Sequence, residues 1–362
     1  MPEIVYKNMD PSMANMYQGQ ETEKAGRMVD EVITSAPLLR YLDSRTTQLN
    51  TIEGWRAKSI GLFGPRPYGF GAESITSNYE RYTASLYNYD GKLEVELALL
   101  RDQANSGIPN KDFFAREGTN VLRGGMVLLD KVLFYGTDLL DFVSPGLTQL
   151  IAPYMTVSAN PAYQSFTESD YNTTEYKNAV KDTSGTSVYF IVKMNKGLEV
   201  IWGNGEGIRR GQLKDTEVQA KSVKGRPGSF EGKVQHFTAK MGLLNNELYF
   251  IGRLKNITKD TGLSDAMIQD AIAQIFNGFD HKPTALFMND FAVTWLRKSR
   301  HTNQDYVAGV SPNTVYAKKP TEVDGIPIIV DNNILLSETK EAIRKDGEKT
   351  FLEASGKTML KY

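Results

Sequence analysis

The chain has 362 residues, with 42 lysines and arginines against 43 aspartates and glutamates, and it has no cysteine. A net charge of −1 argues against a dedicated nucleic-acid-binding protein, which usually has a strong basic excess. Without cysteine there are no disulfides and no thiolate metal sites, and His236, His281 and His301 do not pair at helical spacing, so we expect no metal and no cofactor.

The N-terminal region predicts an extended arm followed by a helix. Residues 1–20 are polar and show no periodicity, whereas residues 21–41 carry apolar side chains on one helical face until Pro37 interrupts them. No basic segment precedes an apolar run, and no apolar run is long enough to cross a bilayer. We therefore expect a protein that is made in the cytoplasm and does not enter a membrane.

Residues 45–91 predict a long β-hairpin. Aromatic and polar residues alternate along residues 49–59 and 79–89, and a cluster of glycine and proline at residues 64–71 separates these two arms. Two strands alone are marginally stable in water, so the hairpin needs another surface to lie on. That surface is either a neighbouring subunit or the hairpin's own domain.

Residues 110–137 predict a long helix. Asn110 provides a start signal, Gly136 provides a stop, and about 26 residues at 1.5 Å per residue make a rod of roughly 39 Å. Charged residues, including Asp130 and Lys131, fall largely outside the apolar face. Apolar residues and glycines that recur at steps of three and four form that face: Phe114, Gly118, Val121, Leu122, Gly125, Met126, Leu129, Val132 and Leu133.

Two glycines, Gly124 and Gly125, lie midway along this predicted helix, where each costs about 1 kcal/mol relative to alanine. They indicate either close packing against a neighbouring element or a functional bend.

The segment from residue 187 to residue 257 is rich in strand signals. Residues 188–192 and 198–202 are β-branched runs separated by Asn-Lys-Gly, which predicts a hairpin. Residues 233–241 alternate as a further strand, and residues 247–251 predict the next one.

The C-terminal part predicts two helices among further strands. Residues 264–276 form an amphipathic helix capped by Ser264, and residues 290–299 form a second helix after a buried strand at 284–288. Residues 321–331 and 334–336 predict the strands that close the sheet. The order of these elements indicates an α+β fold.

Two segments have compositions that occur in binding sites. Residues 203–207, Gly-Asn-Gly-Glu-Gly, resemble a phosphate-binding loop, but no helix is predicted directly after them, so they indicate a loop between strands. Residues 209–226 contain six basic residues and only two acidic ones, Asp215 and Glu217. This basic cluster predicts contact with a polyanion, contact with a neighbouring protein, or a solvated loop. Its members are Arg209, Arg210, Lys214, Lys221, Lys224 and Arg226.

Three segments resemble signature regions of tailed-phage major capsid proteins. Residues 242–257 combine a Gly-Leu pair, a short turn and an apolar strand that ends in Arg-x-x-Asn-Ile. Residues 186–207 resemble the strand pair before it, and residues 321–331 resemble a late strand that contains Asp-Gly-Ile-Pro. The upstream helix, hairpin and long helix also follow the order of that family, so the resemblance covers nearly the whole chain.

The resemblance implies the Hong Kong ninety-seven type capsid fold, an α+β fold with an N-arm, an extended hairpin called the E-loop, a long spine helix, a peripheral domain and an axial domain. The expected divisions are 1–44 for the N-terminal arm and helix, 45–91 for the E-loop, 92–150 for the peripheral domain with the spine helix at 110–137, 151–320 for the axial domain and inserted strands, and 321–362 for the return to the peripheral domain.

The resemblance also implies a function. A major capsid protein is not an enzyme; it self-assembles into the hexamers and pentamers of an icosahedral shell that packages double-stranded DNA, and it would belong to the virion capsid after assembly in the host cytoplasm. Its expected partners are itself, a portal protein and, because few residues precede the first predicted helix, a separate scaffolding protein.

Five residues of the E-loop are the expected inter-subunit contacts: Trp55, Arg56, Phe63, Tyr68 and Phe70. Two alternative functions stay open at this point. One is the shell of an encapsulin-like cellular nanocompartment, and the other is a phosphate-binding enzyme that uses residues 203–207.

Overall fold

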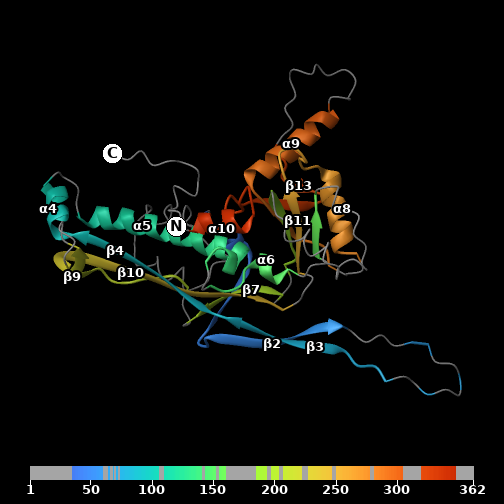
Figure 1. Cartoon of the computed structure of the whole chain (residues 1–362), viewed down its shortest axis with the longest axis horizontal. Coiled ribbons are helices and arrows are strands. Elements are labelled where there is room, and N and C mark those ends of the chain that lie inside the picture. The colour runs from blue at the N-terminus through green and yellow to red at the C-terminus, as the bar shows by residue number, and fades with distance from the viewer. Residues whose placement is uncertain are drawn as a thin grey trace, which may run out of the picture.

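The computed structural model places a long helix and one sheet at one end of the molecule, a second sheet with two helices at the other end, and a hairpin that extends beyond both (Figure 1). The structure describes residues 35–59, 64–65, 68, 71, 74–105, 110–140, 143–151, 155–159, 185–193, 197–203, 207–221, 227–246, 250–277, 281–304 and 319–347. None of the helices in these ranges is long and apolar enough to cross a membrane.

The first sheet has six strands and is built around β10. The path runs β1-β7-β10-β4, while β8 and β9 also pair with β10; β1 is parallel to β7 and the other pairs are antiparallel. The strands are β1 (Asp43–Thr47), β4 (Tyr87–Glu96), β7 (Leu198–Gly203), β8 (Arg209–Arg210), β9 (Lys214–Lys221) and β10 (Pro227–Asn245). Along β10, buried Phe237 and Ala239 alternate with exposed residues, so one face of the sheet is turned to a core.

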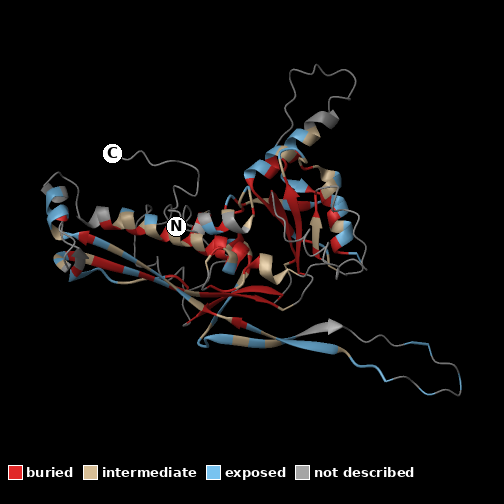
Figure 2. Cartoon of the chain, in the orientation of Figure 1, coloured by how far each residue is buried: buried red, intermediate tan, exposed pale blue. Residues whose placement is uncertain are grey.

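The long helix α5 (Asn110–Tyr135) supplies that core. Its side chains Leu122, Met126, Leu129 and Leu133 are buried in one cluster with residues of β7 and β10. The short helix α3 (Pro37–Tyr41) adds Leu38 to the same cluster. The buried stripe on α5 is visible as red along the helix in Figure 2.

The helix ends two residues before the predicted position. Gly136, at φ +48°, begins the 3-10 turn η1 (Gly136–Asp138), so glycine is the stop signal that the sequence indicated. A Cβ at Gly124 or Gly125 would meet no described atom within 4 Å, so the close-packing interpretation of these two glycines is wrong for the described residues.

The second sheet has the order β13-β14-β12-β6-β11-β5. Its strands are β5 (Thr156–Ser158), β6 (Thr186–Ile191), β11 (Ile251–Ile257), β12 (Ala285–Met288), β13 (Glu322–Val323) and β14 (Ile326–Val330). One face of β6 points Val188 and Phe190 toward α8 (Asp265–Ile275) and α9 (Asp290–Gln304). The other face points Tyr189 and Ile191 toward the core of α5, so every position of β6 is buried.

The remaining described helices are short. They are α4 (Leu97–Asn105), α6 (Leu147–Leu150) and α10 (Lys340–Gly347). The helix predicted at residues 21–41 is described only from residue 35 onward, where α3 follows the Pro37 break.

The sequence assigned several strands to the wrong partner or the wrong segment. β6 and β7 do not form the predicted hairpin of residues 188–202, because each is a central strand of a different sheet. The predicted hairpin arm 79–89 stops at Ser85, and Tyr87 begins β4, which pairs with β10 instead. Residues 334–336 form no strand. They follow a turn in which the Asn333 backbone N–H donates to the Asp331 carboxylate at 2.9 Å.

Two further strand predictions need adjustment. The predicted strand 247–251 falls largely outside the described residues, and β11 starts at Ile251. The segment 321–331 is a tight hairpin of β13 and β14, in which Asp324 and Gly325 adopt positive φ at the turn.

Substituting Gly136 tests the end of the long helix. A Cβ at Gly136 would lie 2.0 Å from the Gly146 backbone nitrogen, so Gly136→Ala combines a positive-φ penalty with a backbone clash and should lower the free energy of unfolding by about 2–5 kcal/mol. Gly262 also has positive φ (+64°) but open space around it, so Gly262→Ala is the matched control, with an expected loss of about 1–2 kcal/mol. Equal losses in urea unfolding would contradict the clash.

Candidate functional site

The hairpin of β2 (Thr51–Ser59) and β3 (Asn78–Ser85) projects away from both sheets. The two strands pair antiparallel from Thr51 opposite Ser85 to Ser59 opposite Asn78. Figure 2 shows the outer part of β3 in pale blue, and Trp55 and Tyr79 are 70% and 62% exposed. The hairpin is therefore not folded back on its own body.

The base of the hairpin is fixed to the first sheet. A small cluster of Ala84, Leu86, Ile201 and Leu244 is buried there, with Ile52 and Tyr82 packed against it. The Tyr82 hydroxyl donates to the Asn246 side-chain oxygen, just beyond β10. A Cβ on Gly54 would lie 2.2 Å from that hydroxyl, so glycine is needed for the Tyr82 ring to cross the partner strand.

The five expected contact residues are only partly visible in the structure. Trp55 is exposed, and Tyr68 at the tip is fully exposed. Arg56 lies in β2 opposite Glu80, but its side chain is outside the described set, and Phe63 and Phe70 lie outside the described residues altogether.

Sequence reasoning passed over Tyr79 as a contact residue, although it is another large exposed aromatic of the hairpin. Its alternation with polar residues in β3 was the signal that could have identified it.

The basic cluster is divided among different surroundings. The Arg210 guanidinium donates to the Phe114 carbonyl at 3.3 Å and lies over Gly118, so it is directed at α5. Arg209 in β8 and Lys214 at the start of β9 are exposed. Lys221 lies in β9 but its side chain is not described, and Lys224 and Arg226 are outside the described residues.

The middle of the glycine-rich segment 203–207 lies outside the described residues. Gly203 ends β7, and the residues described after the segment enter strand β8. A phosphate-binding loop requires a helix directly after it, and the described residues place a strand there. Within the described residues, no group of three histidine, aspartate or glutamate side chains is arranged to hold a metal ion.

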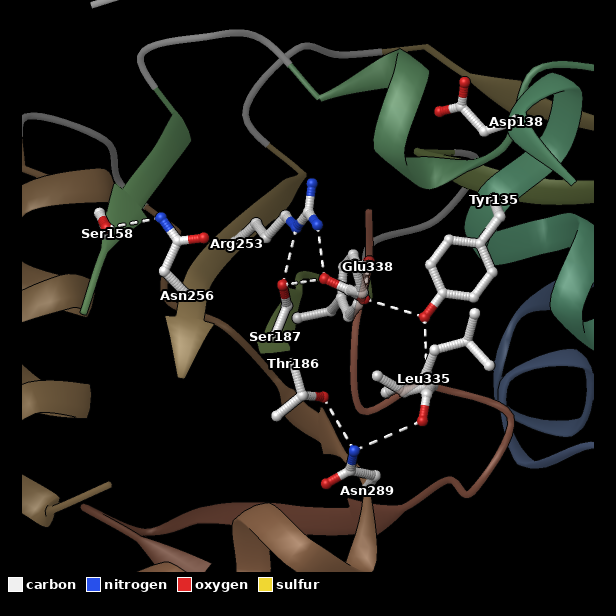
Figure 3. Close-up of polar contacts among 12 residues, drawn as sticks. Tyr135, Asp138, Ser158, Thr186, Ser187, Arg253, Asn256, Asn289, Leu335 and Glu338 are labelled. Atoms are coloured by element: carbon white, nitrogen blue, oxygen red, sulfur yellow. Dashed lines mark hydrogen bonds and ion pairs between the residues drawn. The ribbon is translucent and has the colours of Figure 1, made fainter. Parts of the chain in front are cut away.

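A buried polar joint connects the long helix to the second sheet (Figure 3). Glu338, whose side chain has no exposed surface, lies between β14 and α10 and accepts hydrogen bonds from Tyr135 and Tyr189, each at 2.9 Å. It also accepts from Ser187 and forms an ion pair with Arg253 at 2.5 Å. One carboxylate thus joins α5, β6, β11 and the C-terminal segment.

The joint is held in one protonation pattern. Burial, followed by the charge of Glu338, raises the pKa of Tyr135 well above its ordinary value, and burial also raises the pKa of Tyr189. Both phenols therefore keep their protons and act as donors to Glu338. The Tyr135 hydroxyl additionally accepts from the Leu335 N–H at 2.8 Å, which fixes the chain just before Glu338.

Two further charged residues of α5 are buried, in contrast to the sequence-based placement outside the apolar face. Lys131 pairs with Asp346 of α10 at 2.5 Å, and both side chains are more than nine-tenths buried. Asp130 has no exposed surface and accepts from Leu39 and Asn333. The reason is that both residues have partners from distant parts of the chain, which a helical pattern does not reveal.

The fold is similar to that of a solved phage structure. A chain in the near-atomic cryo-EM structure of bacteriophage epsilon15 has a TM-score of 0.54 and 17% identity, over 82% of this chain and 86% of that chain. The bacteriophage JBD30 capsid is a more distant similarity, with a TM-score of 0.45 and 11% identity over 87% of this chain and 94% of that chain. The chain thus shares its fold with the epsilon15 chain, and the predicted α+β fold class is confirmed.

The family is shown by a model that matches residues 160–342, just over half of the chain, and is described as Major capsid protein GP7. The chain belongs to this family, and it is a structural protein of the capsid shell. The comparison with curated proteins finds no match.

The buried joint predicts unequal effects for two tyrosines. Tyr135→Phe removes one hydrogen bond to Glu338 and leaves the Leu335 N–H without its acceptor, so the free energy of unfolding should fall by about 2–4 kcal/mol. Tyr189→Phe removes only a donor to Glu338, so a loss of about 1 kcal/mol is expected. Denaturant unfolding of both variants checks this order, and a larger loss for Tyr189→Phe would contradict it.

Proposed function

We propose that the chain assembles into pentamers and hexamers of an icosahedral shell that packages double-stranded DNA. The proposal rests chiefly on one observation, the hairpin β2–β3, on which Trp55 and Tyr79 are exposed in the isolated subunit. Symmetric assemblies cover such surfaces with identical copies of the chain. Membership of the capsid family supports the same conclusion.

In this proposal the hairpin is the E-loop and lies on the adjacent subunit. The first sheet and α5, as the spine helix, would form the peripheral domain, and the second sheet with α8 and α9 would form the axial domain at the centre of each capsomer. The division differs slightly from the sequence-based one, since β1 and β4 belong to the first sheet and the E-loop is then limited to residues 48–86.

The remaining partners are proposed on the resemblance alone. They are a separate scaffolding protein and a portal protein, with assembly in the host cytoplasm. Arg209 and Lys214, which are exposed, would contact either the packaged DNA or an acidic surface of a neighbouring subunit.

The shell proposal is tested by expressing the chain alone and with candidate scaffolding proteins, followed by negative-stain microscopy and light scattering. Shells, or rings of five and six subunits, would support it. A small monodisperse species under all conditions would contradict it, and shells that hold a protein cargo without DNA would favour the encapsulin-like alternative.

Trp55 tests whether the hairpin carries the contact. Burying an aromatic side chain contributes about 1.5–3 kcal/mol, so Trp55→Glu should lower the yield of shells by at least tenfold. Its thermal unfolding as a free subunit should stay unchanged, because Trp55 is 70% exposed. Trp55→Phe, which keeps an apolar ring, is the matched control and should assemble. Full shells from Trp55→Glu would refute the proposed contact.

Variants of the basic cluster separate a surface role of Arg209 and Lys214 from a structural role of Arg210. The double variant Arg209→Ala, Lys214→Ala should keep its free energy of unfolding within about 0.5 kcal/mol and yield shells with less DNA if the cluster meets DNA, or fewer shells if it meets a neighbour. Arg210→Ala should instead lose about 1.5–3 kcal/mol of stability, because Arg210 bonds the Phe114 carbonyl. Normal shells with normal DNA content from the double variant would refute the surface role.

A further inference from the structure

Three distant segments meet at Asp130, in the second half of α5. Its carboxylate accepts from the Leu39 N–H of α3 and from the side-chain amide of Asn333, both at 2.8 Å. The same Asn333 amide donates to the Ser35 carbonyl at 2.9 Å. The start of the described N-terminal segment is therefore tied to the long helix and to the turn after β14.

Asp331, in that turn, presents a second buried carboxyl group. Its Oδ1 accepts from the Asn333 N–H, but its Oδ2 is buried and has no hydrogen-bond partner among the described residues. Both Asp130 and Asp331 have no exposed surface. A buried carboxylate oxygen without a donor is costly, so the arrangement needs one more hydrogen.

No described cation neutralises this pair. The adjacent charge on α5, Lys131, is paired with Asp346 of α10, and Arg40, the only charged residue of α3, is exposed. Among the described residues, neither Asp130 nor Asp331 forms an ion pair with lysine, arginine or histidine. Asn333 donates to both carboxylates, so two negative charges would lie close together in a buried site without compensation.

The electrostatics act in the same direction on both groups. Burial, and then the charge of Asp331, raises the pKa of Asp130 well above its ordinary value, despite the hydrogen bonds from Leu39 and Asn333 that lower it. Burial also raises the pKa of Asp331, although interactions with Asp130, Asn333 and the Leu38 N–H lower it. Interacting carboxyl groups of this kind titrate as a pair.

We propose that Asp130 and Asp331 share one proton and form a pH-sensitive latch that holds residues 35–39 against the long helix. The shared proton gives the Oδ2 atom of Asp331 its missing hydrogen bond to Asp130, and it reduces the buried charge from two to one. When the proton leaves, the two carboxylates repel each other at the point where the N-terminal segment meets α5. The latch is independent of the proposed DNA shell.

The sign of the pH dependence follows from proton counts. Above pH of about 4 both carboxyls are ionised in the unfolded chain, whereas the folded pair keeps one proton. The stabilisation is fully present below the unfolded pKa and is lost as the pH rises toward the raised folded pKa. Over that window the unfolding equilibrium constant should increase by up to tenfold per pH unit.

The variant Asp331→Asn carries an amide N–H in place of the shared proton, and this hydrogen is not lost as the pH rises. Its side-chain oxygen can still accept from the Asn333 N–H, and its amide nitrogen can donate to the ionised Asp130 carboxylate. Relative to the unmodified chain, Asp331→Asn should gain stability progressively from pH 5 to pH 8. Hydrogen exchange of the Leu39 amide, corrected for its intrinsic pH dependence, should be slower in this variant at pH 8.

Two comparison variants complete the experiment, which uses urea unfolding of the full chain at pH 5 and pH 8. Asp90→Asn, at an exposed position of β4, should show no pH-dependent difference from the unmodified chain. Asp130→Asn should be destabilised at both pH values, because one of its acceptor oxygens becomes an amide that faces the N–H groups of Leu39 or Asn333.

Two results would overturn the latch. One is an equal loss of stability for Asp331→Asn at both pH values. The other is a dependence of the unmodified chain's stability on added calcium or on a chelator that Asp331→Asn abolishes, which would assign the pair to a cation instead of a proton.

Discussion

A two-stranded hairpin that extends from the body of a protein cannot bury a core of its own, and this constraint shapes the rest of the molecule. Among the described side chains, β2 and β3 bury residues only at the base of the hairpin, while Trp55 and Tyr79 remain in solvent in the isolated subunit. The outer hairpin therefore gains stability only when another surface covers it. In a family of shell-forming proteins, a second copy of the same chain is the natural covering surface.

The body of the subunit is built to hold that hairpin in a fixed direction. β10 pairs with four other strands of the first sheet and supplies Leu244 to the base of the hairpin. The long helix lies on the same sheet and is connected to the second sheet by the buried carboxylate of Glu338. An external arm is thus linked through continuous packing and hydrogen bonds to both sheets, which suits a subunit whose contacts must repeat with one geometry.

The elements that the sequence predicted best carry local signals. The long helix has a sustained apolar period with a start and a glycine stop, and α8 has its Ser264 cap, whose hydroxyl accepts from the Met267 N–H at 3.3 Å. Strand partners were harder, because β6 and β7 are buried at every position, so neither strand has the in-and-out alternation that would identify a neighbour. The buried polar side chains of the long helix were not predictable, since the side-chain partners of Asp130, Lys131 and Tyr135 all lie beyond residue 330 or before residue 40. Trp55 could be chosen from sequence because a hairpin without a core exposes its aromatics.

Hydrogen exchange measured by mass spectrometry on the free subunit and on assembled shells tests the central claim most directly. The backbone amides of β2 and β3 should exchange rapidly in the free subunit and become protected in the shell, while those of β6, which is buried in the subunit, should change little. Equal exchange of the hairpin amides in both states would contradict the claim that a neighbouring copy covers the hairpin.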